Sequence, residues 1–118
     1  MRAPTAKVLV VAARQPVFAE LLEKDGFEVE LRTRPLEEAE GAEADVAVVF
    51  RGRLIGRAQA PALVDRGIPV VEVVNMEPQS VSTAEWIRLS NRVAKADLAQ
   101  VVHAVAAWSR RRVEALEA

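Results

Sequence analysis

Three short runs of β-branched and apolar residues, at 8–11, 46–50 and 68–74, most constrain how this chain folds. Each run is nearly continuous in hydrophobicity, which is typical of a parallel strand that helices cover on both faces. Segments with helical spacing separate the runs, as from Phe18 to the helix-ending Gly26. Because strand and helix alternate, the pattern predicts an α/β sheet with right-handed crossovers.

The weaker signals complete this pattern. The residues Phe27–Leu31 alternate between apolar and charged, which predicts an edge strand with one exposed face. A fifth, brief strand is expected at Arg92–Lys95. The remaining predicted helices are one at 35–43, one at 57–66, a short one capped by Ser82 or Thr83 that carries Trp86, Ile87 and Leu89, and a long one from Asp97 to about Glu117. The result is a doubly wound, flavodoxin-like sheet of order 2-1-3-4-5 with five helices.

Length and composition indicate one folded domain over 1–118, with a core at about 6–107. With 51% hydrophobic and 28% charged residues, the chain is too apolar to be disordered. It has no cysteine and one histidine, His103, which excludes disulfides and thiolate zinc sites. A net charge of -1 gives no strong nucleic-acid footprint, and the short first apolar run indicates neither secretion nor a membrane span. A cytoplasmic location is expected.

The order of elements, together with the segment from Arg92 to Leu98, resembles the receiver domain of bacterial response regulators. The resemblance covers about residues 6–107 and implies a phosphorylation site at the carboxyl ends of the strands. In that family two acids after the first strand hold a divalent metal, and an aspartate at the end of the third strand accepts the phosphoryl group. A hydroxyl follows the fourth strand, and a lysine just after the fifth binds the phosphate.

The positions that match these groups carry almost none of that chemistry, which was lost or was never present. They are Ala12 and Ala13 for the acid pair, Phe50 for the aspartate, Val74 for the hydroxyl, and Lys95 for the retained lysine. Phosphoryl transfer to a carboxylate needs an oxygen nucleophile and oxygen ligands for a cation. The resemblance therefore implies a degenerate pseudo-receiver that is not an enzyme and uses no cofactor or metal. Lys95 has a plainer interpretation, with its stem over Phe50 and its head in solvent or beside a carboxylate.

Two kinds of function remain open at this point. The first is protein–protein contact in signalling or regulation, as a homodimer or with another protein. In receivers the face formed by the fourth helix, fifth strand and fifth helix is the usual contact surface. The residues expected to map there are Trp86, Arg88, Arg92, Val105 and Trp108. Either tryptophan equally suits a place at the edge of the core.

The second kind of function is the sensing of a small anionic metabolite or nucleotide. Its candidate ligands are the basic residues expected near the strand ends, Arg14, Arg51, Arg53 and Lys95. The sequence has no GxGxxG or P-loop spacing to support this hypothesis, and a solvated rim explains the same residues.

The last predicted helix is longer than a helix that only covers the sheet. Its length of some 20 residues corresponds to about 30 Å. The two turns from Arg110 to Glu117 are therefore expected to project. Its apolar positions come close to a heptad seam, which favours helix pairing. They are 98, 101/102, 105, 108/109, 112/113 and 116.

Overall fold

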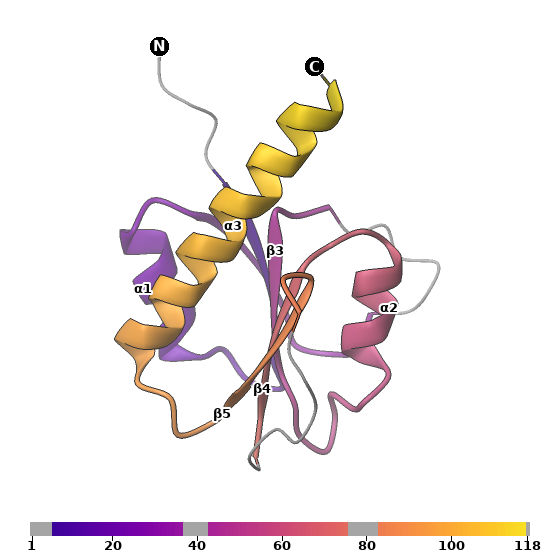
Figure 1. The fold of residues 1–118 in the computed structure, drawn as a ribbon. Helices are drawn as coiled ribbons and strands as arrows, with labels where there is room; N and C mark the ends of the chain where they lie inside the picture. Colours follow the sequence, from indigo (N-terminus) through magenta and orange to yellow (C-terminus); the bar gives the residue numbers. More distant parts are fainter. Residues whose placement is uncertain (1–5, 37–42, 76–82, 118) are drawn as a thin grey trace.

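The computed structural model describes residues 6–36, 43–75 and 83–117, which form a five-stranded sheet and three helices (Figure 1). The elements in chain order are β1 (Lys7–Val11), α1 (Val17–Lys24), β2 (Glu28–Arg32), β3 (Val46–Phe50), α2 (Gln59–Asp65), β4 (Val70–Val74), β5 (Trp86–Ser90) and α3 (Lys95–Glu117).

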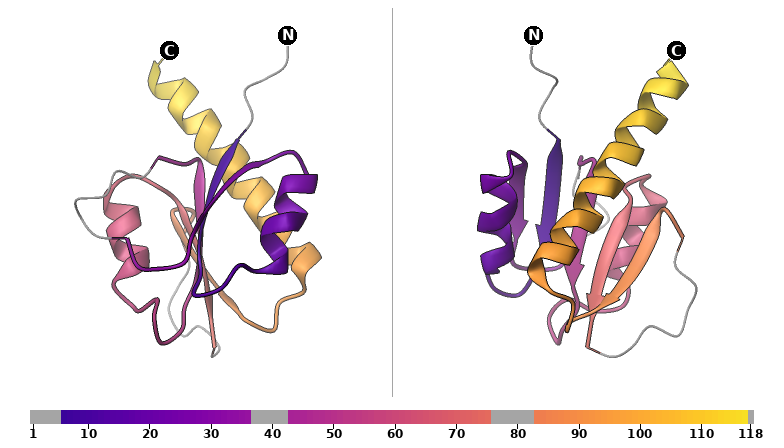
Figure 2. Two further views of the ribbon diagram at one scale, coloured as in Figure 1. Left: turned by 180° about the vertical axis from the view of Figure 1, so that it is seen from behind. Right: turned by 60° about the vertical axis from the view of Figure 1, so that its left-hand side comes forward.

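All strand pairs in the sheet are parallel, and the order is β2-β1-β3-β4-β5. This confirms the predicted flavodoxin-like order. The three apolar runs form β1, β3 and β4, the inner strands, and they are almost completely buried. The alternating segment forms β2 at one edge, displaced by one residue from the prediction, and β5 forms the other edge (Figure 2).

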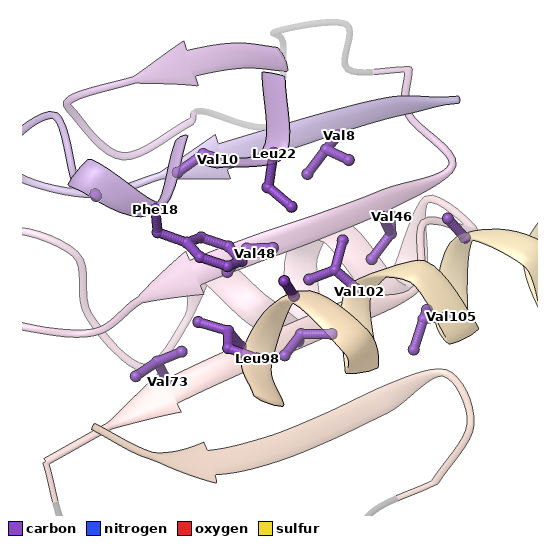
Figure 3. Close-up of a cluster of buried hydrophobic side chains, with 14 residues drawn as sticks. Val8, Val10, Phe18, Leu22, Val46, Val48, Val73, Leu98, Val102 and Val105 are labelled. Carbon is purple, nitrogen blue, oxygen red and sulfur yellow. The ribbon is translucent and has the colours of Figure 1, made fainter. Parts of the chain in front are cut away.

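Successive side chains of the strands point to opposite faces, so the sheet has two apolar layers. On one face, side chains such as Val8, Val10 and Val48 pack beneath α1 and α3, together with Phe18 and Val102 (Figure 3). On the other face, the alternate residues of the same strands pack beneath the short helix α2. The sheet is thus the middle layer between helices, as expected for its parallel strands.

Two of the predicted elements are wrong in their placement. The segment from Trp86 to Ser90 is the strand β5, not a short helix, and 92–95 form no strand. The reason is alternation at period 2: Ile87 and Leu89 pack with the cluster under α3, whereas Trp86 packs with the cluster under α2. The helix expected at 35–43 falls mainly outside the described residues.

The last helix begins at Lys95, two residues before the predicted cap. Asp97 instead lies in its first turn, where a carboxylate interacts favourably with the helix dipole. None of the helices in the described part of the chain is long and apolar enough to cross a membrane.

Candidate functional site

The carboxyl ends of β1, β3 and β4 lie side by side. In α/β folds, ligands usually bind at these ends of the strands. Apolar groups occupy these ends. Ala12 follows β1 and is 4% exposed, and Val74 ends β4 and is 5% exposed. The backbone N–H of Ala12 donates to the carbonyl of Arg32 at 3.0 Å, which extends the β1–β2 pairing past the last residue of β1. Ala13, the next residue, is exposed.

Phe50 ends β3 between these two strands and packs against an aromatic neighbour. Its ring meets that of Phe18 from α1 edge-on, with 6.1 Å between the centroids and 67° between the planes. Edge-to-face pairs of this kind are favourable beyond the area that they bury. An apolar contact to α1 therefore stands at the position that the family resemblance assigns to the phosphoryl-accepting carboxylate.

Among the described residues, the polar groups at the carboxyl ends of the strands include two side-chain amides. Asn91 donates its side-chain Nδ2–H to Oδ1 of Asn75 at 2.9 Å, linking the segments that follow β5 and β4. Within the described residues, no three side chains of the His, Cys, Asp or Glu types gather as a metal site would need.

Lys95 does not directly follow the last strand. Because β5 ends at Ser90, four residues separate the strand from Lys95, which is exposed in the first turn of α3. The segment that carried the sequence resemblance, Arg92–Leu98, is a loop followed by a helical turn.

The four residues proposed to hold an anion lie in two kinds of environment. Arg14, Arg53 and Lys95 are exposed, whereas the Nε of Arg51 lies 3.7 Å from the Oε2 of Glu72. A cavity of about 750 Å³ lies elsewhere, and its lining contains none of the four. It lies along α2. Its lining residues are Pro35, Leu36, Gly56, Ala58, Gln59, Pro61, Ala62, Leu63, Asp65 and Arg66.

Known proteins resemble this chain in fold but not in sequence. No family model and no curated protein matches the sequence. Among solved structures, a response regulator receiver protein from Sinorhizobium medicae is similar with a TM-score of 0.64 at 19% identity, covering 89% of this chain and 97% of the other. The chemotaxis protein CheY4 of Vibrio cholerae has a TM-score of 0.64 at 14% identity, covering 86% and 99%.

The chain has the fold of a response-regulator receiver. The match spans nearly the full length of both receivers, so the similarity is that of a whole domain. Identities below one fifth show the architecture, not the activity.

This receiver fold contains a polar cluster that the sequence pattern did not predict. Glu72 lies at the centre of β4, is 0% exposed, and faces the α2 side of the sheet. Arg88, directly opposite on β5, has its Nε 3.0 Å from Glu72 Oε1, and the indole Nε1–H of Trp86 donates to the same oxygen at 3.2 Å. We call Glu72, Arg51, Arg88 and Trp86 the Glu72 cluster.

Charge pairing makes the burial of Glu72 possible. An unpaired carboxylate in a protein interior is very unfavourable, whereas one held by guanidinium groups is tolerated. Arg88 also stacks over the ring of Trp86, with its Cζ 4.6 Å from the centroid. The detectable signal in the sequence was a glutamate at the middle of Val70–Val74, a run whose other positions are all valine.

The five residues proposed as an interface lie in different environments. Trp86 and Arg88 belong to the Glu72 cluster, on the α2 side of the sheet, whereas Val105 lies on α3 and is buried against the opposite face. Val105 thus offers little surface to a partner. Trp108 is half-buried with the Arg112 guanidinium 4.7 Å from its centroid, and Arg92 is exposed.

The single histidine takes part in a surface contact between helices. His103 Nε2 on α3 lies 3.0 Å from Asp25 Oδ2 at the end of α1, and its ring lies 4.5 Å from that of Phe27. These contacts explain its position without any chemical role.

Proposed function

We propose that this protein is a phosphorylation-independent pseudo-receiver that acts through protein–protein contacts in bacterial signalling or regulation. The observation that carries the proposal is the apolar filling of the strand ends, above all the packing of Phe50 on Phe18, within a receiver fold. The domain would act in the cytoplasm without catalysis of its own.

The physical argument concerns the charge that a phosphoryl group brings. In receivers its transfer requires a nucleophilic carboxylate oxygen and compensation of negative charge by a metal that further carboxylates hold. Ala12, Ala13 and Phe50 offer neither, and a phosphoryl group beside Phe50 would meet an aromatic ring. Contacts between folded surfaces need none of this chemistry.

Incubation with a small-molecule phosphodonor and Mg²⁺, followed at once by intact-protein mass spectrometry, tests the proposal. A receiver with an intact aspartate serves as the positive control under the same conditions. We expect a phosphoryl adduct on the control and none on this protein. A stable adduct here would overturn the proposal.

The anionic-ligand hypothesis receives less support. Of its four residues, Arg51 lies beside the buried carboxylate of Glu72, which reduces the charge available to a ligand. A thermal-shift series with phosphorylated metabolites, repeated on the Arg53→Ala and Lys95→Ala variants, separates the hypotheses. A shift that both variants lose would favour ligand sensing.

A further inference from the structure

The face of α3 that packs on the sheet continues beyond the sheet as exposed apolar residues. Leu98, Val102, Val105 and Ser109 follow one another at spacings of four, three and four residues, and each is at most 6% exposed. The same spacing continues to Val113 and Leu116, which are 45% and 81% exposed. One stripe of the helix is therefore buried along its first part and open along its last turns.

The geometry of the fold explains this change. The 23 residues of α3 span about 34 Å, whereas each five-residue strand spans about 17 Å. The end of the helix consequently extends past the sheet, as the yellow end of the ribbon shows (Figures 1 and 2). We call residues Arg110–Glu117 the α3 arm.

The base of the arm is fixed to the domain. Arg112 donates its Nη2–H to the carbonyl of Gly67 at 3.2 Å, and its Nη1 lies 3.5 Å from Oε1 of Glu85. Its guanidinium also stacks on Trp108, one turn earlier. These contacts hold the direction of α3 where it leaves the sheet, so the arm presents its apolar stripe in a defined orientation.

We propose that the α3 arm pairs in antiparallel orientation with the arm of a second copy of this chain, with Val113 near the twofold axis. This pairing rests on the proposed function, which is action through protein–protein contacts, and it makes a second copy of the chain the partner. Apolar stripes on two projecting helices are buried most simply against each other, as in short coiled coils.

The order of charges in the arm supports a second copy and sets the orientation. Arginines at positions 110 and 112 precede Val113, and Glu114 follows it. Antiparallel pairing places Glu114 of each helix beside the arginine-containing turn of the other, whereas parallel pairing places like charges beside each other. The contact is isologous and therefore closes as a dimer. Because the contact between the two arms is short, we expect the dimer to be weak and to form only at high protein concentration.

Cysteine cross-linking tests the pairing directly, since the chain has no cysteine of its own. In the proposed dimer, two copies of Val113→Cys meet near the axis and form an intermolecular disulfide under mild oxidation. Two copies of Leu116→Cys stand about 9 Å apart along the helix axes, beyond disulfide reach. Arg111→Cys, about 160° around the same helix, is the matched control. We expect Val113→Cys to cross-link roughly tenfold faster than either, since only it lies near the axis.

Sedimentation across a concentration series provides the second measurement. The exposed substitution Leu116→Lys should weaken self-association about tenfold or more, because each copy loses a buried leucine. Its thermal unfolding should match that of the unsubstituted chain. A wild type that remains monomeric throughout, or a Val113→Cys rate equal to that of Arg111→Cys, would overturn the pairing. Equal rates for Val113→Cys and Leu116→Cys would overturn its antiparallel orientation. Neither result bears on the phosphodonor assay, so the two proposals fail separately.

Discussion

The Glu72 cluster predicts a marked difference between two arginines that contact the same carboxylate. Arg88 lies opposite Glu72 in the sheet with an N–O distance of 3.0 Å, whereas Arg51 approaches only to 3.7 Å. Substitution by methionine keeps most of the side-chain length and removes the charge. We expect Arg88→Met to destabilise the fold far more than Arg51→Met does.

The magnitude follows from the burial of the carboxylate. Removing one partner of a fully buried ion pair costs about 3–5 kcal/mol. The side chain of Glu72 is 0% exposed but keeps Trp86 and Arg51, so the loss of Arg88 should cost about 2–3 kcal/mol, near the value of a hydrogen bond to a charged group. Arg51 lies beyond hydrogen-bond distance of Glu72, so its loss should cost about 1 kcal/mol.

Urea unfolding, followed by circular dichroism and tryptophan fluorescence, measures these differences without adding salt that screens charges. Arg53→Met, on an exposed residue of the turn after β3, is the control and should change stability by less than about 0.5 kcal/mol. The double variant Glu72→Met with Arg88→Met should be less destabilised than the sum of the single changes, because no buried carboxylate is left behind. If Arg88→Met matched the Arg53→Met control, or cost no more than Arg51→Met, the assigned role of the cluster would be wrong.

Three further predictions concern other parts of the fold. Phe50→Asp should remain unphosphorylated in the phosphodonor assay, because Ala12 and Ala13 still provide no metal ligands; an adduct by mass spectrometry would contradict this. Gly67 has φ +84° with open space around its missing Cβ, so Gly67→Ala should cost about 1 kcal/mol in urea unfolding from backbone strain alone, and an unchanged midpoint would refute that cause. Arg112→Ala should lower stability by about 1 kcal/mol, with a smaller loss at high salt where the pair with Glu85 is screened; a salt-independent loss would exclude the ion pair as the cause.

The inner strands could be predicted from the sequence because burial on both faces leaves a continuous apolar run. The edge strand β5 could not, since its large residues at 86, 87 and 89 also fit a helical face and polar residues before it suit a helix cap. What decides between the two is pairing with β4, residue by residue from Val70 with Trp86 to Val74 with Ser90. That pairing depends on contacts distant in sequence, to which a local pattern is insensitive.

The same distinction applies to the candidate site. The apolar character of the strand ends could be predicted because each position is defined locally, as the residue at the end of an apolar run. The predicted place of Lys95, directly after the last strand, rested on a strand predicted at 92–95. Because that strand is instead Trp86–Ser90, Lys95 lies in the first turn of α3. The Glu72 cluster joins three strands, and its glutamate and two arginines are ordinary residues until the sheet brings them together.

In this chain the apolar strand ends and the buried ion pairs thus occupy different parts of one sheet. The first is the basis of the proposed lack of phosphorylation, whereas the second ties the end of β3 and the strand β5 to β4. These contacts link the segment after β3 and both strands β4 and β5 through charged side chains, an arrangement that suits the constant contact surface of the proposed function.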